Sequence, residues 1–415
     1  MEARCPVVLD TAGLDVHAEA ARVRANGPIS QVELPGGIVA WAVTGHDVAR
    51  QVLSDSRFTK DPRSWPKAAN GEIPPDWPMI TWVVMDNMTT RDGDDHKRLR
   101  KVIARGFTAH RVKETRPLIE KITQELLDDL AQVPPGEVVD LKARFAYPLP
   151  ARVVCDLFGV PEEARADALR GGEVNVSTSI TPEEAEANVE QWHRAMLELA
   201  EHKRREPGDD LTSLLVKPDG DDRSQLSDEE MAGTLHLMLG AGSETLMNVL
   251  SHAVRHLLTH PEQRALVESG EASWDDVFEE TIRVDSPAAM LPFRFATEDV
   301  EIGGVVVRKG DPVLMGFAGI GRDPEVHGDT AGEFDVTRAD KTHLSFGHGL
   351  HYCLGAPLAR LEAMIALPAL FERFPRIELA VAPEDLEPQG TFIMNGHRAL
   401  PVRLTPPADL DRLAS

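Results

Sequence analysis

One segment near the C-terminal end carries the strongest pattern in the chain, His343-Leu-Ser-Phe-Gly-His-Gly-Leu-His-Tyr-Cys-Leu-Gly-Ala-Pro-Leu-Ala-Arg360. Its spacing is F-G-x-G-x-x-x-C-x-G, formed by Phe346, Gly347, Gly349, Cys353 and Gly355. Glycines permit backbone conformations that other residues resist, and they let a flat ligand approach the main chain. Cys353 precedes a strongly helical run, and backbone N–H groups at a helix N-terminus favour a thiolate over a thiol. The segment therefore predicts a thiolate that can bind a metal.

The cysteines of the chain, Cys5, Cys155 and Cys353, are far apart and odd in number. We therefore expect no disulfide framework and a protein of the reducing cytoplasm. Cys155 stands in an apolar run and is expected in the core. Zinc is disfavoured at Cys353 because no second cysteine is close enough for a CxxC pair. A haem iron, in contrast, needs only one protein thiolate.

The glycine and cysteine pattern resembles the haem-binding loop of the cytochromes P450, the haem-thiolate monooxygenases. The resemblance implies haem b, iron protoporphyrin IX, with Cys353 as its axial thiolate and with Phe346, Gly347 and Gly355 against the cofactor. It implies a mainly α fold with small β-sheets (α+β), shaped as a triangular prism around a buried haem. The resemblance extends over nearly the entire chain, so we expect a single domain over residues 1–415, with a β-rich N-terminal part at about 28–60.

An ion-pair network is the first further element of the resemblance. Glu280 and Arg283 form an ExxR pair on one helix face, 70 residues before the cysteine. Arg338 precedes the loop in the place of the family's third partner. These residues resemble the network that supports the haem pocket without taking part in the chemistry.

The longest predicted helix contains Gly240-Ala-Gly-Ser-Glu-Thr245 at its centre. One interpretation is close packing against another helix, because small residues otherwise weaken a helix centre. The other is a groove for dioxygen, because Glu244 and Thr245 resemble the family's oxygen-activating pair, which delivers protons. Leu246 departs from the family's usual Thr or Ser, and this departure affects only a secondary hydroxyl.

Partners for the haem propionates are the third element. His96 and Arg100 share a helix face and resemble the family's H-x-x-x-R. Arg294 and His351 match two further propionate positions, and cationic or donor groups are what a carboxylate needs.

The substrate side resembles one group of actinobacterial P450s that hydroxylate steroids, macrolactones and other bulky apolar molecules. By position in the family, the expected pocket residues are Met85, Met88, Val174, Asn175, Gly240, Ala241, Met290, Leu291, Ile393 and Met394. Several are methionines, which adapt to varied shapes.

Composition restricts the partners of the chain. The formal net charge of its 415 residues is −24, which argues against nucleic acid and against an anionic membrane. No apolar run approaches the ~20 residues of a membrane-spanning helix. No reductase domain is recognisable, so the resemblance implies electrons from a ferredoxin and its reductase. Lys97, Arg98, Arg105 and Arg360 are either a basic patch for an acidic ferredoxin or scattered surface cations.

Two other functions stay open at this stage. A haem-thiolate binding protein without turnover would not need Glu244 and Thr245. A P450 that catalyses oxidative coupling, or another atypical oxidation, would keep every residue named above.

Periodicity predicts helices at 96–107, 116–132, 147–160, 182–205, 277–284 and 358–374, and the longest one from residue 227 to about 259. Strands are expected at 31–43, as a hairpin around Pro35-Gly36-Gly37, and at 300–307 and 311–315, as paired strands. Residues 61–92 carry many tryptophans and methionines and are expected to cover a cavity.

Overall fold

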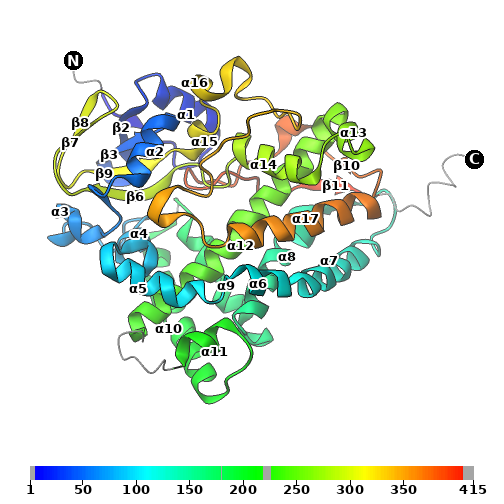
Figure 1. Cartoon of the computed structure of the whole chain (residues 1–415), viewed down its shortest axis with the longest axis horizontal. Helices are drawn as coiled ribbons and strands as arrows, with labels where there is room; N and C mark the ends of the chain where they lie inside the picture. Colours follow the sequence, from blue (N-terminus) through cyan, green and yellow to red (C-terminus); the bar gives the residue numbers. More distant parts are fainter. Residues whose placement is uncertain (1–4, 179, 218–225, 405–415) are drawn as a thin grey trace, which may run out of the picture.

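A computed structural model describes residues 5–178, 180–217 and 226–404 of the chain. Helices dominate it (Figure 1). The helices are α1 (Val16–Arg24), α2 (His46–Ser54), α3 (Pro66–Ala69), α4 (Thr81–Val84), α5 (Gly93–Ala104), α6 (Ala109–Glu114), α7 (Arg116–Leu130), α8 (Pro148–Leu157), α9 (Arg165–Asn175), α10 (Pro182–Arg205), α11 (Leu211–Val216), α12 (Asp228–Thr259), α13 (Pro261–Ser269), α14 (Trp274–Val284), α15 (Phe317–Ile320), α16 (Pro324–His327) and α17 (Ala356–Arg373).

Helix α12 is the central element, and its first turn follows from the sequence. The backbone N–H of Glu230 donates to Ser227 Oγ at 3.1 Å, and the N–H of Ser227 donates to Glu230 Oε2 at 3.0 Å. This capping box satisfies two of the free donors at the helix start. The helix then runs for 32 residues, which is about 48 Å, and it ends before Pro261. Helices α8, α9, α10, α14 and α17 all pack against it.

Eleven strands form three small sheets in the part of the chain that the structure describes. The largest sheet has the order β1-β2-β3-β9-β6-β4, the second β10-β11-β5, and the third β7-β8. The strands are β1 (Val7–Val8), β2 (Ile29–Leu34), β3 (Ile38–Val43), β4 (Phe58–Thr59), β5 (Val138–Asp140), β6 (Leu291–Ala296), β7 (Val300–Ile302), β8 (Val305–Val307), β9 (Pro312–Met315), β10 (Glu378–Leu379) and β11 (Pro401–Arg403). The sheet that contains β2, β3, β6 and β9 and the β7–β8 hairpin lie on one side of the molecule, and β10 and β11 lie on the other side (Figure 1).

The expected pairing of 300–307 with 311–315 is wrong. Residues 300–307 fold back on themselves as the β7–β8 hairpin, because Gly303 and Gly304 supply two positive φ angles, 57° and 80°, for a two-residue turn. Strand β9 pairs instead with β3 and β6. The hairpin around Pro35–Gly37 joins β2 and β3 as predicted.

The segment between β4 and α5 is packed rather than solvated. Trp65 and Trp77 lie in an apolar cluster with Phe293 and Phe295, and their ring centroids are 5.7–6.1 Å from those of the phenylalanines. The indole N–H of Trp77 donates to Pro35 O at 2.9 Å. The segment therefore contacts both the turn between β2 and β3 and the side chains of β6.

The predicted fold class, mainly α with small sheets, is confirmed. No helix among residues 5–178, 180–217 and 226–404 is both long enough and apolar enough to cross a membrane. Cys155 is buried in an apolar cluster, as expected, and burial raises the pKa of its thiol to about 12.

Candidate functional site

Cys353 stands two residues before Gly355, the N-cap of α17. Its backbone N–H donates to Phe346 O at 2.8 Å, which closes the glycine-rich loop. Protein atoms surround the sulfur on most sides, yet the residue is accessible. Burial raises the pKa of the Cys353 thiol, whereas the N–H groups of Gly355 and Ala356 and the charges of Arg100 and Arg360 lower it. Burial is the larger effect, so the pKa of the Cys353 thiol is raised overall, and the helix start opposes that rise without overcoming it.

Of the four predicted propionate partners, the two histidines are in contact and the two arginines lie apart. The rings of His96 and His351 lie edge to face with centroids 4.6 Å apart. Arg100 Nη2 donates to Tyr352 O at 2.7 Å, so this guanidinium holds the loop directly before the cysteine. Arg294 lies on β6 and is 5% exposed.

His96 and Arg294 suit the carboxylates of a haem, because both can form further hydrogen bonds or ion pairs. Both ring nitrogens of His96 are buried and have no hydrogen-bond partner among the described residues. Burial lowers the pKa of Arg294 to about 10, and Asp92 is the one opposing charge acting on it within the described parts of the chain. Buried donors and cations without partners are costly. An anionic ligand with several acceptor oxygens removes that cost, and a haem propionate is such a group.

The centre of α12 is accessible although its flanks are buried. Ala241 is exposed and Gly240 and Thr245 are partly exposed, whereas Leu239 and Leu246 are buried. Thr245 Oγ1 donates to Ala241 O at 2.8 Å, a bond from a side chain to the preceding turn that bends helices. Glu244 is 4% exposed. This arrangement fits the dioxygen-groove interpretation at Ala241 and Thr245.

Gly240 follows the packing interpretation instead. It faces Gly172 of α9 so closely that a Cβ on Gly172 would lie 3.0 Å from Gly240 Cα. Close helix packing therefore describes Gly240, and the dioxygen groove describes Ala241, the next residue of the same helix turn.

Glu280, Arg283 and Arg338 form a buried ion-pair network. Arg283 donates to Glu280 through Nε and Nη2, each at 2.7 Å, and both residues are fully buried. Arg338 Nε lies 3.1 Å from Glu280 Oε1. Arg283 also donates to the backbone oxygens of Gly321, Ala331 and Glu333, so the network connects α14 to the chain before the cysteine loop.

The predicted substrate residues lie in several places. Met290, Ile393 and Met394 share one apolar cluster, and Ala289 N donates to Ile393 O at 2.8 Å. Leu291 packs against a neighbouring cluster. Met88 is buried with Leu239 of α12, and Met85 and Val174 are partly buried. Asn175 contacts His236 of α12 and accepts from Asn188 Nδ2 at 3.1 Å.

Arg98, Lys97 and Arg360, among the cations suggested for a ferredoxin patch, each pair with a carboxylate of the chain. Arg98 pairs with Glu230, Lys97 with Asp94, and Arg360 with Glu279. Arg360 also lies over the Phe346 ring at 4.6 Å, where it supports the loop.

Sequence reasoning missed Lys60 and Asp92. Burial and the charge of Arg294 lower the pKa of Lys60 to about 7. Burial opposes the ionisation of Asp92, but hydrogen bonds from His351, Thr59 and the Lys60 N–H lower its pKa to about 2. Neither residue belongs to a local motif: Lys60 reaches the site through the pairing of β4 with the distant strand β6, and Asp92, at the start of α5, reaches it through hydrogen bonds with Lys60 and His351.

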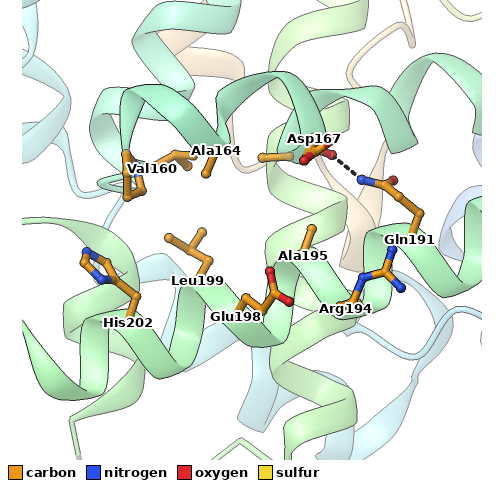
Figure 2. Close-up of a pocket in the computed structure, with 11 residues that line it drawn as sticks. Val160, Ala164, Asp167, Gln191, Arg194, Ala195, Glu198, Leu199 and His202 are labelled. Carbon is orange, nitrogen blue, oxygen red and sulfur yellow. Dashed lines mark hydrogen bonds between the residues drawn. The ribbon is translucent and has the colours of Figure 1, made fainter.

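A separate cavity of about 190 Å³ lies between α9 and α10, far along the chain from the cysteine loop (Figure 2). Gln191 Nε2 donates to Asp167 O at its rim, at 2.9 Å. None of the site residues described above lines this cavity.

Comparisons with known proteins agree with this site. The family model "Cytochrome P450" matches residues 179–268 and 274–398. The 2-hydroxy-5-methyl-1-naphthoate 7-hydroxylase of Streptomyces carzinostaticus is 57% identical over 401 residues, which cover 96% of this chain and 98% of the relative. The 6-deoxyerythronolide B hydroxylase of Saccharopolyspora erythraea is 38% identical over 402 residues, 95% of this chain and 97% of the relative.

A solved structure gives the same assignment. CYP154C4 from Streptomyces sp. W2061 superposes with a TM-score of 0.93 at 44% identity, covering 97% of this chain and 98% of that one. A cysteine loop at a helix N-terminus, a buried ExxR network and relatives that match over nearly the full length all point to one conclusion. The chain belongs to the cytochrome P450 family of haem-thiolate monooxygenases.

Proposed function

We propose that the chain inserts one oxygen atom of O2 into a C–H bond of a bulky, mostly apolar secondary metabolite. Haem b bound through Cys353 supplies the oxygen activation, and a ferredoxin with its reductase supplies the electrons. The observation that carries the proposal is the loop that places Cys353 at the start of α17, near the buried His96 ring, whose nitrogens have no hydrogen-bond partner among the described residues and suit a carboxylate. Separate experiments test Cys353 as the iron ligand and the reaction with the substrate.

The residues of the chain have distinct tasks in this proposal. Cys353 Sγ binds the iron, and the N–H groups of Gly355 and Ala356 hold negative charge on the sulfur. Thr245 Oγ1 donates to Ala241 O and still accepts a hydrogen bond on the accessible side of α12. Glu244, the preceding residue, relays protons from water. His96 and Arg294 neutralise the propionates.

The substrate class is supported by the relatives and by the composition of the expected pocket. The names of the two relatives specify a naphthoate and a macrolactone as substrates of those proteins. Met290, Ile393 and Met394 would present an apolar wall to a substrate of either kind. We place substituted naphthoates first, because the naphthoate hydroxylase is 57% identical to this chain, whereas the 6-deoxyerythronolide B hydroxylase is 38% identical.

Carbon monoxide binding to the reduced protein tests the iron ligand. We expect a strongly red-shifted Soret band for the native chain and its loss in Cys353→Ser. Cys155→Ser is the matched control, because Cys155 is buried in a separate apolar cluster, and it should keep the shifted band. A shifted band that survives in Cys353→Ser would contradict the assigned ligand.

Product analysis tests the reaction. The holoenzyme is supplied with a ferredoxin, its reductase and a panel that contains a hydroxynaphthoate, a macrolactone and a steroid. A product heavier by one oxygen atom, labelled from ¹⁸O2, supports hydroxylation. A dimeric product without added oxygen would support the coupling alternative, and spectral binding without any product would support the binding-protein alternative.

A further inference from the structure

Lys60 belongs to a cluster of cationic and imidazole groups that four segments of the chain bring together. Strand β4 pairs antiparallel with β6, with Thr59 opposite Phe295, so Lys60 continues the register opposite Arg294. The backbone N–H of Lys60 donates to Asp92 Oδ2 at 3.0 Å. His351 Nε2 lies 3.3 Å from Asp92 Oδ1, and the His96 ring lies 4.6 Å from the His351 ring.

The charges of this cluster do not balance. Arg294 is buried, Lys60 beside it is partly buried, and Asp92 is the one carboxylate that acts on both cations in the described parts of the chain. The charge of Arg294 adds to burial in lowering the pKa of Lys60 to about 7. Two like charges held close together, one of them buried and the other partly buried, are stabilised by an anion nearby. A further negative charge close to Lys60 and Arg294 would therefore stabilise the cluster.

The carboxylate of Asp92 forms hydrogen bonds with groups other than the Lys60 ammonium. Its Oδ2 accepts from the Thr59 hydroxyl and from the Lys60 N–H, and its Oδ1 faces His351. Among the described residues, the ammonium of Lys60 forms no ion pair with Asp92. Asp92 thus positions the backbone of Lys60 and the His351 ring, and it leaves the ammonium without a direct partner.

We infer that the Lys60 ammonium binds a carboxylate of the haem, as an additional propionate partner beside Arg294 and His96. The inference rests on the haem site proposed above and adds a residue that no motif of the sequence indicates. The same ammonium suits the carboxylate of a naphthoate-like substrate, so the experiment must distinguish these two sources. Charge-assisted bonds of this kind are the strong ones, particularly away from water.

The experiment is a chemical double-mutant cycle on haem loss. The native chain and Lys60→Met are each reconstituted with iron protoporphyrin IX and with its dimethyl ester, which has no carboxylate. Transfer of the haem to apomyoglobin in excess is followed by absorbance, without substrate. We expect Lys60→Met to lose the free-acid haem about tenfold faster, which corresponds to about 1.4 kcal/mol, and to lose the ester at the native rate.

Two further variants separate charge from structure. Lys60→Arg should restore slow loss of the free-acid haem, and Lys67→Met, at an exposed lysine of α3, should behave as the native chain. Equal acceleration for both haems would mean that Lys60 acts only on the fold, and it would overturn the inference. An unchanged haem-loss rate would also overturn it, and weaker binding of a hydroxynaphthoate by Lys60→Met would then assign the ammonium to the substrate. Failure of the haem proposal itself is separate, because it appears as absence of the shifted carbon monoxide band in the native chain.

Discussion

The role of the Thr245 hydroxyl can be tested by a single substitution. This hydroxyl is held by Ala241 O at 2.8 Å on the accessible part of α12, where it can take part in proton delivery. We expect Thr245→Ala to bind substrate normally and to lower product formed per electron pair by about tenfold or more, within the range of a lost proton-transfer group. Product yield is measured against NAD(P)H consumed and hydrogen peroxide released.

The serine variant provides the control for this prediction. Thr245→Ser keeps a hydroxyl that can donate to Ala241 O, so it should keep most of the native coupling. A native yield in Thr245→Ala would remove the hydroxyl from the mechanism. An equal loss in the serine variant would assign the effect to the methyl group and to packing.

Single residues were predictable from the sequence where a local motif defines them. Cys353, Glu280 and Arg283 stand in such motifs, and the structure places Cys353 at a helix start and the other two in contact. Lys60 and Asp92 were not predictable, because Lys60 is placed by strand pairing between residues 58–59 and 295–296, and Asp92 by hydrogen bonds with Lys60 and His351. Spacing along a chain carries no information about a contact of that range.

At the scale of elements, the Glu280 network joins α14 to the segment before the cysteine loop. Glu280 accepts from Arg283, Arg338 and the Asp335 N–H and is fully buried. Loss of its charge leaves the buried Arg283 without an anion. We expect Glu280→Gln to cost about 3–5 kcal/mol of stability, the range for one partner of a buried pair, and to lower the yield of haem-containing protein. Thermal melting and the haem-to-protein absorbance ratio measure both.

Asp275 provides a matched control on the same helix. It is an exposed acid in the first turn of α14. Asp275→Asn should lower stability by less than about 1 kcal/mol, because it removes only a surface interaction with the helix dipole. If the two variants melted alike, the network would carry no special stability.

The crossing of α9 and α12 gives a second prediction at this scale. Gly172 and Gly240 bring the two backbones together, and a Cβ on Gly172 would lie 3.0 Å from Gly240 Cα. We expect Gly172→Val to cost about 1–3 kcal/mol through overpacking and to weaken substrate binding by moving α9 away from α12. Gly332→Ala, at an open position with nothing within 4 Å, is the control and should leave both the melting temperature and substrate affinity unchanged.

Elements were predictable where the sequence contains their end signals. The helix expected at 182–205 matches α10, because Thr181 and Glu184 form a capping box before Pro182. The helix expected from residue 96 begins at Gly93 and ends at Ala104, since periodicity locates a helix but not its ends. The β7–β8 hairpin was missed although Gly303 and Gly304 signal its turn.

At the scale of the whole molecule, the helical body and its long central helix were expected, and the sheet order was not. Strand β3 pairs with β9, which lies more than 260 residues later. This pairing brings the N-terminal strands to the same sheet as β6, which carries Arg294 (Figure 1). The proximity of Lys60 and Arg294 therefore follows from topology more than from local sequence.

Buried histidines predict how the stability of the whole molecule depends on pH. Burial lowers the pKa of His236 to about 4 and that of His256 to about 3. In the unfolded chain these imidazoles bind protons below their ordinary pKa of about 6.5, whereas the folded chain resists protonation until near pH 4. Stability is therefore complete above about pH 6.5 and falls as the pH drops toward 4, by up to about 1.4 kcal/mol per pH unit for each imidazole.

Melting temperatures at pH 7.5, 6.0 and 5.0 measure this dependence, and one substitution isolates a single imidazole. His236 stacks on Trp192 with ring centroids 4.3 Å apart, so His236→Phe keeps the stacking and removes the titrating group. We expect its melting temperature to fall less steeply with acidification than that of the native chain. His110→Gln, at an exposed histidine of α6, should keep the native slope. Parallel slopes for the native chain and His236→Phe would mean that His236 takes up its proton in the folded state within this range, against the effect of its burial.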